Sequence, residues 1–450
     1  MLDVVGALVT IGVIMVLGFI GNYIFNKTQI PSIIWLLFFG LAVGFFFNIR
    51  SDVNPTVLQS FSEFVGAVTI VIILFDGGIT TDLHQLFRGA PRGLLMSVVG
   101  FVFSIVGSLV VVVALSASGV LALSLENSVI VGVVLGAVIG GTSGPIVIPL
   151  AGRLKNLEAK TKTVLSIESI VTDILCIVVV LAIVYMVTFG GGINLGVGIK
   201  NLVSTFSVGA VLGFVLGLVW LPIMQKVRSI EFSYILTLAI VFLVYSLTTL
   251  LIGVEEGGSG AGAISCLVFG LVLGNGKKVL TMMDYSGDGY DMDQQTKQFH
   301  SLISFIIRTF FFVYLGIIAS FQKIEFVIIG VVIVFVLFGL RYLAVRVSTY
   351  KGGFALDDQQ TMMVMLPRGL AAAILASLYG PILIQHLMPN VEEFFFGDIA
   401  FVVILGTVLI CTIGISLISY TQKKKNMCMG QGSTDDKQTK KDTREEIEHP

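Results

Sequence analysis

Thirteen apolar runs, each about 20 residues long, follow one another along this 450-residue chain. A run of this length is what an α-helix needs to cross the hydrocarbon core of a bilayer, which is about 30 Å thick. Only 12% of the residues are charged and 56% are hydrophobic, whereas a soluble domain carries about 25% charged residues. These features predict an all-α, multi-pass membrane protein without a large water-soluble domain. The runs are roughly 4–24, 30–49, 57–80, 92–117, 127–151, 161–189, 196–222, 231–252, 258–275, 299–320, 324–349, 359–380 and 395–420.

Positively charged residues are distributed unequally between the alternate loops that join these runs. One set of loops holds fourteen Lys and Arg before the last helix, and the opposite set holds three, namely Arg50, Lys200 and Lys323. Because cytoplasmic loops carry the excess of Lys and Arg, we expect a cell-membrane protein with its N-terminus outside and its C-terminus in the cytoplasm. Residues 1–422 then form the membrane domain. Residues 423–450 are polar and highly charged, which predicts a disordered cytoplasmic tail.

Six charged residues lie deep in the apolar runs, where no loop accounts for them. A charge at the centre of a membrane helix costs about 2.5–3.5 kcal/mol on insertion scales and usually marks an ion or proton pathway. Three of the six are acids and three are bases, so we expect pairing, since an unpaired buried charge is strongly destabilising. The six residues are Asp76, Glu168, Asp173, Arg308, Arg341 and Arg368.

The run at 161–189 carries two of these acids near its middle. Asp173 lies about 18 Å from the start of the run, because a helix rises about 1.5 Å per residue, and this depth is close to the midplane. Ser169 and Asp173 share one helix face, and Glu168 and Thr172 share the neighbouring face. One face can line an aqueous cavity while the other packs against a basic partner. The alternative is that both acids are members of structural salt bridges.

Two other runs contain helix breakers in their interiors. Residues 140–145 read Gly-Gly-Thr-Ser-Gly-Pro, and residues 366–369 read Leu-Pro-Arg-Gly. These runs are seven spans apart, so the two helices run in opposite directions, as in an inverted repeat in which spans 4–6 correspond to spans 11–13. In such folds the broken helices cross near the midplane and present their dipoles and free backbone groups to the substrate. The alternative is that glycine and proline are simply frequent in membrane helices.

In their order along the chain, these motifs resemble the monovalent cation:proton antiporters of the NhaP type, relatives of the animal sodium/proton exchangers. The resemblance covers about residues 1–420. Residues 168–173, Glu-Ser-Ile-Val-Thr-Asp, resemble the family's Glu-Ser-x-x-Asn-Asp, whose last Asp binds cation and proton alternately. Asp76, within Leu-Phe-Asp-Gly-Gly, is similar to the acid that the third helix contributes to the ion cavity. Arg341 matches the arginine that pairs with the glutamate of this motif, and Arg368 matches the Arg-Gly motif of the second broken helix.

The chain departs from the family pattern at three positions. The first broken helix of the family usually reads Thr-Asp-Pro, whereas here Thr142 is followed by Ser143, Gly and Pro, so a carboxylate is replaced by a hydroxyl. Thr172 replaces the Asn before the last Asp. Arg308 falls where some relatives have an acid, and it either lines the cavity or extends to the cytoplasmic surface.

The resemblance implies the sodium/proton antiporter fold, about 13 transmembrane helices with an inverted repeat and two crossed broken helices. It also implies a homodimer. Scaffold and dimerisation helices are expected at about 1–90 and 196–320, and core helices at about 92–190 and 324–420. The expected activity is electroneutral exchange of a monovalent cation, Na⁺, for H⁺ by alternating access. The alternatives are a K⁺/H⁺ antiporter on the same scaffold and a cation channel or sensor.

The expected site residues fall into two classes. Oxygen ligands suit an alkali cation such as Na⁺, K⁺ or Li⁺, and direct ligation is assigned to Asp173, Ser169 and Asp76. No cofactor, enzymatic nucleophile–base pair or nucleic-acid surface is expected from the chain, whose net charge is −1. The full set of ion- and proton-binding candidates is Asp173, Ser169, Asp76, Thr142, Ser143 and Thr172, and the structural or charge-compensating candidates are Glu168, Arg341, Arg368 and Arg308.

Overall fold

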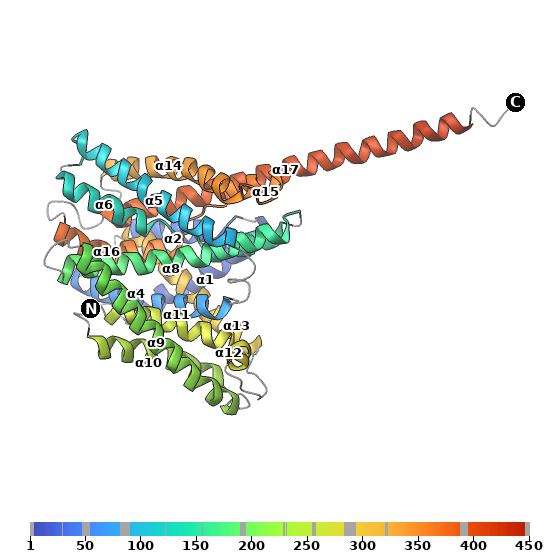
Figure 1. Ribbon diagram of the computed structural model, residues 1–450. Coiled ribbons are helices and arrows are strands. Elements are labelled where there is room, and N and C mark those ends of the chain that lie inside the picture. The colour runs from blue at the N-terminus through green and yellow to red at the C-terminus, as the bar shows by residue number, and fades with distance from the viewer. Residues whose placement is uncertain are drawn as a thin grey trace.

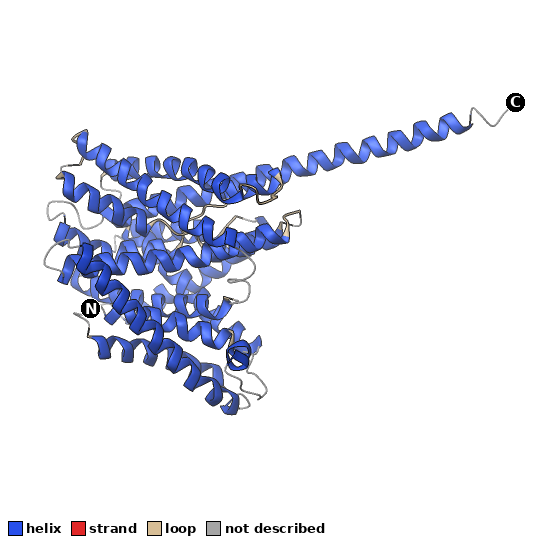
Figure 2. Ribbon diagram, in the orientation of Figure 1, coloured by secondary structure: helices blue, strands red, loops and turns tan. Residues whose placement is uncertain are grey.

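The computed structural model consists of helices and the loops that join them, with no strand in the part of the chain that it describes (Figure 2). The residues described are 4–28, 30–46, 55–81, 91–121, 123–154, 156–189, 195–227, 230, 232–253, 258–282, 294–319, 323–387 and 395–445.

Within those residues the chain forms sixteen helices. In chain order they are α1 (Val4–Thr28), α2 (Ser32–Phe46), α4 (Pro55–Thr80), α5 (Pro91–Ala117), α6 (Leu125–Val138), α7 (Gly144–Arg153), α8 (Ala159–Phe189), α9 (Leu195–Val227), α10 (Ser233–Ile252), α11 (Gly258–Gly274), α12 (Gly276–Met282), α13 (Gln294–Ile318), α14 (Ile324–Thr349), α15 (Leu356–Val364), α16 (Leu370–Leu387) and α17 (Phe395–Glu445).

Each of the thirteen apolar runs coincides with one helix or with a broken pair of helices. The two broken pairs are α6 with α7 and α15 with α16, which are the runs that contain the predicted breakers. Seven helices in the described residues are long and apolar enough to cross a bilayer, and six further apolar segments of 10–17 residues lie within α1, α2, α4, α6, α11 and α16. The all-α membrane architecture is therefore confirmed, while the number of thirteen crossings stays a prediction.

The helices pack in two groups (Figure 1). One group contains α5, α6, α8, α14, α16 and α17, and the other contains α1, α2, α4, α9, α10, α11 and α13. In Figure 1 the first group reaches the edge formed by α14, α5 and α6, and the second reaches the opposite edge formed by α9 and α10. Contacts of α16 with α4 and α13, and of α8 with α9, join the groups. The assignment of these groups as core and scaffold, and their relative movement, stay predictions.

Helices α2 and α13 approach each other closely at a pair of glycines. A Cβ atom built on Gly40 would lie 2.9 Å from the Cα of Gly316, and one built on Gly316 would lie 2.8 Å from the Cα of Gly40. Because real Cβ atoms do not come this close, only glycine fits at both positions. The contact fixes the height and rotation of α13 in its group.

Helix α17 continues beyond the last apolar residue and projects away from the bundle as far as Glu445 (Figure 1). The composition of residues 423–450 predicts disorder instead. Lys, Gln, Met and Glu in this segment have high helix propensity, but its Gly, Ser, Thr, Asn and Asp residues have low propensity. An isolated helix derives most of its stability from packing an apolar face, so disorder of this tail in solution stays a prediction.

Candidate functional site

The two interruptions in the broken helices lie against each other. Helix α6 ends at Val138 and α7 begins at Gly144, while α15 ends at Val364 and α16 begins at Leu370. The backbone N–H of Ser143 donates to the carbonyl of Pro367 at 2.8 Å, which joins the two interrupted segments directly. The prediction that these segments meet is thus confirmed. The hydrogen bond satisfies a backbone N–H and a backbone carbonyl that the interrupted helices leave without intrahelical partners.

Ser143 occupies the closest point of this crossing. It precedes the first residue of α7, but its side chain makes no capping hydrogen bond. Its hydroxyl is buried and has no hydrogen-bond partner among the described residues. A Cβ built on Gly369 would lie 2.5 Å from the Cβ of Ser143, so glycine is required where the second interruption passes the first. The Ser143 hydroxyl is therefore a polar group at the crossing that can still accept or donate a hydrogen bond.

Thr142 and Thr172 tie the first interruption to α8. The backbone N–H of Thr142 donates to the hydroxyl oxygen of Thr172 at 3.0 Å, and the two hydroxyl oxygens lie 3.3 Å apart. The Thr172 hydroxyl in turn donates to the carbonyl of Glu168 at 2.8 Å. Thr172 thus supports the backbone of the interruption, a role that its position beside Asp173 in the sequence did not predict.

Asp173 and Ser169 face the beginning of α7 from α8. A Cβ atom built on Gly141 would lie 3.0 Å from a carboxylate oxygen of Asp173. A Cβ atom built on Gly144 would lie 3.6 Å from the hydroxyl oxygen of Ser169. The Asp173 carboxylate, which is half-buried, also faces the backbone N–H of Gly144. The start of a helix carries partial positive charge and unpaired N–H groups, so the first turn of α7 stabilises this carboxylate without neutralising it.

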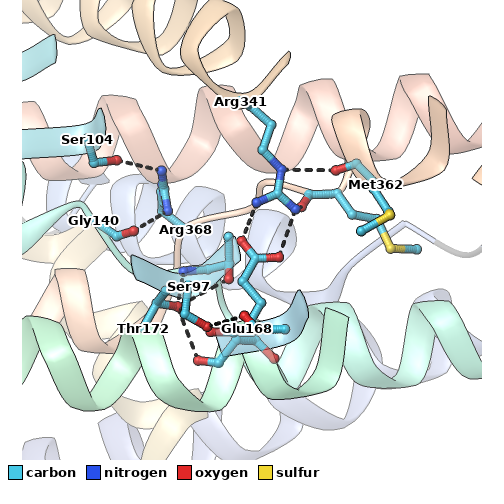
Figure 3. A network of polar contacts seen from close by, with 12 residues as sticks. Ser97, Ser104, Gly140, Glu168, Thr172, Arg341, Met362 and Arg368 are labelled. Carbon is cyan, nitrogen blue, oxygen red and sulfur yellow. Dashed lines mark hydrogen bonds and ion pairs between the residues drawn. The ribbon is translucent and has the colours of Figure 1, made fainter. Parts of the chain in front are cut away.

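Glu168 and Arg341 form a buried, bidentate ion pair between α8 and α14 (Figure 3). One guanidinium nitrogen of Arg341 contacts Glu168 Oε1, and Nη2 donates to Oε2 at 2.9 Å. Arg341 also donates to the carbonyl of Met362 at 2.9 Å and to that of Met365 at 2.7 Å. These carbonyls lie at the end of α15 and immediately after it, so the expected partner of Glu168 also caps the first half of the second broken helix.

Arg368 performs a similar task at the other interruption (Figure 3). Its Nη1 donates to the carbonyl of Gly140 at 2.6 Å, just beyond the end of α6, and its Nη2 donates to the hydroxyl of Ser104 at 2.9 Å. Its backbone N–H donates to the hydroxyl of Thr407 at 3.0 Å. Neither Ser104 nor Thr407 could be singled out from the sequence, because their only signal there is a hydroxyl inside an apolar helix.

A small polar space separates the two buried arginines. It is lined by Ser104, Gly140, Glu168, Arg341 and Arg368, together with apolar residues of α5 and α14. The Nε of Arg368 is buried and makes no hydrogen bond within the part of the chain that the structure describes. This space belongs to the support of the crossing, because its polar lining consists of groups that hold the interrupted helix ends.

Asp76 and Arg308 lie together on the other group of helices. Asp76 is half-buried near the end of α4, and its charge interacts with that of Arg308 on α13. The Nε of Arg308 donates to the carbonyl of Ser304 at 3.1 Å. The six deep charges therefore sort into Glu168 with Arg341, Asp173 near Arg368, and Asp76 near Arg308. Only the first is a direct ion pair within the described residues.

Known proteins resemble this chain along most of its length. The family model for the transmembrane sodium/hydrogen exchanger matches residues 12–422. The K⁺/H⁺ antiporter NhaP of Alkalimonas amylolytica is 23% identical over 88% of this chain and 63% of its own length. Na⁺/H⁺ antiporter 1 of Methanocaldococcus jannaschii is 24% identical over 91% of this chain and 92% of its own length. The chain thus spans slightly less than two thirds of the first relative.

A solved structure shares the fold. The structure of the sodium proton antiporter MjNhaP1 from Methanocaldococcus jannaschii superposes with a TM-score of 0.75, at 22% identity, covering 91% of this chain and 99% of that one. The interrupted helices, the buried charges of the crossing and the match over residues 12–422 together lead to one conclusion: the chain belongs to the sodium/hydrogen exchanger family.

Proposed function

We propose that the protein exchanges a monovalent cation, Na⁺, for H⁺ across the cell membrane by alternating access. The family assignment and the relatives, one described as an Na⁺/H⁺ antiporter and one as a K⁺/H⁺ antiporter, support this class of activity. The proposal includes the membrane orientation expected from the loop charges, with the C-terminus in the cytoplasm, and a homodimer built on the scaffold helices.

The observation that carries the proposal is the state of Asp173. Within the described residues this half-buried carboxylate makes no ion pair, although it lies beside the first helix interruption and its charge interacts with that of Arg368. A carboxylate in a membrane that lacks a fixed counter-ion requires a mobile one. When Asp173 is ionised it can hold an alkali cation, and when it is protonated it has no charge to hold one. Cation and proton therefore exclude each other at this residue.

Neighbouring oxygens complete the proposed cation site. Ser169 shares the helix face of Asp173, and the hydroxyls of Thr142 and Ser143 belong to the adjacent interruption. Thr172 contributes by holding Thr142 in place. Asp76 is the remaining acid of the expected set, and its charge interacts with that of Arg308. With Asp173 as the single exchanging carboxylate, one cation crosses for one proton and transport is electrically neutral.

The surrounding charges keep this site stable. Arg368 and Arg341 donate to the carbonyls at the ends of α6 and α15, which carry the negative ends of the half-helix dipoles. Glu168 balances Arg341. The binding groups of α8 and the two broken helices would move as one unit against the scaffold, as in other transporters that are built from inverted repeats.

Potassium is the second candidate for the cation, and Ser143 is the reason. A neutral hydroxyl stands at the crossing where the related proteins usually carry a carboxylate, which lowers the negative charge available for compensating the dehydration of the ion. Such a site favours a larger ion that dehydrates more easily. The relative described as a K⁺/H⁺ antiporter supports this alternative.

The test is exchange in proteoliposomes with Asp173→Asn. We expect gradients of Na⁺ to drive proton movement in the wild type and not in this variant. Asp357→Asn is the matched control, because Asp357 is exposed in the first turn of α15. Sodium-driven proton flux that survived Asp173→Asn would refute the proposal. Parallel assays with Li⁺ and K⁺ decide the cation, and a membrane-potential dye tests electrical neutrality.

A further inference from the structure

The two broken pairs lie in matching surroundings. Helices α6 and α7 both pack on α8, and α15 and α16 both pack on α17. The long helix that precedes each pair also packs on the helix that follows it, α5 on α8 and α14 on α17. Each interruption is five residues long, 139–143 in the first pair and 365–369 in the second. Counting back from the second half-helix therefore matches Thr142 with Arg368 and Ser143 with Gly369.

The matched residues Ser143 and Gly369 contact each other. A Cβ atom built on Gly369 would lie 2.5 Å from the Cβ of Ser143. Residues that a two-fold axis relates lie at equal distances on either side of it, so two such residues in contact lie next to the axis. This contact places a local two-fold axis at the crossing, as an inverted repeat requires. Helices α8 and α17 then occupy equivalent positions on opposite sides of the crossing.

Each of these two helices carries a buried threonine that holds one interruption. Thr172 of α8 is 1% exposed and Thr407 of α17 is 0% exposed. Each hydroxyl donates to the carbonyl four residues earlier in its own helix, at 2.8 Å and 2.7 Å respectively. Each hydroxyl oxygen also accepts a backbone N–H at 3.0 Å, Thr172 from Thr142 and Thr407 from Arg368. The two donors are the residues that the counting matches, so the two threonines are equivalent in both of their hydrogen bonds.

We propose that Thr407 is a positioning residue for cation exchange and the counterpart in α17 of Thr172 in α8. The inference rests on the proposed function, because it concerns the geometry of the cation site at the crossing. Asp173 follows Thr172 in the sequence, whereas Val408, which is buried, follows Thr407. The second repeat thus keeps the threonine and lacks the acid, so Thr407 acts through the backbone that it holds.

Two successive hydrogen bonds connect Thr407 with the first interruption. The Thr407 oxygen fixes the backbone N–H of Arg368. The carbonyl of the preceding residue, Pro367, accepts the N–H of Ser143 at 2.8 Å. Ser143 immediately precedes α7, and the first turn of α7 faces the carboxylate of Asp173. A displacement of the second interruption therefore changes the position of the helix start that stabilises Asp173.

Removing the Thr407 hydroxyl should weaken cation binding. Thr407→Val keeps the shape of the side chain but leaves the buried N–H of Arg368 without its acceptor, and the second interruption should move to satisfy this group. The oxygens at the crossing then lose their arrangement, so the KM for sodium should rise about tenfold. The kcat should change less, because Asp173 itself is retained. Thr407→Ser keeps the hydroxyl and should restore most of the loss.

The experiment compares the exchange kinetics of these variants in proteoliposomes. Thr412→Val is the matched control, because the half-buried Thr412 lies on the same helix and its hydroxyl donates to the carbonyl of Val408 in that helix. An unchanged KM in folded Thr407→Val would overturn the inference. A KM that stayed high in Thr407→Ser, or that rose equally in Thr412→Val, would do the same. If Thr407→Val folds poorly, Thr407→Cys replaces it, and its weakly accepting sulfur should give an intermediate KM.

Amide hydrogen exchange measures the same effect without transport. Peptides that contain residues 139–143 and 365–369 should both exchange faster in Thr407→Val than in the wild type or in Thr412→Val, because the hydrogen bonds that hold both interruptions are weakened. Faster exchange confined to the second interruption would refute its coupling to the first. A wild type that fails to exchange Na⁺ for H⁺ would refute the proposed function alone, since the amide measurement still tests what Thr407 positions.

Discussion

Replacing Arg341 by Met should destabilise the protein more than replacing Glu168 by Gln. Removing one partner of a buried ion pair costs about 3–5 kcal/mol, which is the cost expected for Glu168→Gln. Arg341 has two further acceptors, the carbonyls of Met362 and Met365. Each buried carbonyl left without a partner adds about 1–3 kcal/mol, so Arg341→Met should cost about 5 kcal/mol or more.

The double variant Glu168→Gln/Arg341→Met isolates the ion pair from these carbonyl contacts. Because neither charge is then left alone, its cost should be smaller than the sum of the single costs by about 2–3 kcal/mol. The assay is reversible unfolding in mixed micelles, with Arg346→Met as the control for loss of an exposed arginine on the same helix. Additive single and double costs would refute the reasoning, and so would equal costs for the two single variants.

Three further predictions concern the crossing. Thr172→Val keeps the side-chain shape but removes the acceptor of the Thr142 N–H. It should lower the free energy of unfolding by about 1–3 kcal/mol, and exchange kinetics should show a higher KM for the cation. An unchanged KM would restrict Thr172 to a structural role. Gly369→Ala forces a methyl group against Ser143 and should cost about 1–3 kcal/mol, and Ser143→Gly should restore most of the loss if this contact is the cause. Ser143→Asp adds a carboxylate to the crossing and should shift the ratio of kcat/KM values toward Na⁺ and Li⁺ over K⁺; a ratio that stayed constant would show that Ser143 does not face the transported ion.

The helices and their breaks could be predicted because they depend on local composition. The bilayer demands about 20 apolar residues for a spanning helix, and proline and glycine interrupt the hydrogen-bond ladder wherever they stand together. The pairing of Glu168 with Arg341 was also accessible, since it followed from the family resemblance and from the cost of an unpaired buried charge.

The partners of Arg368 could not be predicted from local patterns. Its guanidinium reaches Gly140 and Ser104, which precede it by 228 and 264 residues, and these contacts exist only because the two breaks cross. A serine in an apolar helix more often bonds to its own backbone four residues earlier, as Ser97 does with Gly93 in the same helix. The sequence does not distinguish these two serines.

The neighbours of Asp76 could not be predicted from its depth in the membrane. Helix α4 packs mainly against α11 and also contacts α13, α16 and α10, and the charge of Asp76 interacts with that of Arg308. Which acid meets which base depends on helix packing, and packing depends on contacts such as that between Gly40 and Gly316. These contacts leave no periodic signal in the sequence.

The distribution of counter-ions explains why one of the three deep acids is suited to exchange. Glu168 is neutralised by a bidentate partner, and Asp76 faces a guanidinium on the neighbouring helix. The arginine nearest to Asp173 donates instead to Gly140 and Ser104, so Asp173 receives only its field and the partial charge at the start of α7. A carboxylate held in this way is stabilised within the bundle, but its negative charge is not balanced by a full positive charge. A small cation or a proton can supply that charge, and no side chain in the described part of the structure forms an ion pair with Asp173.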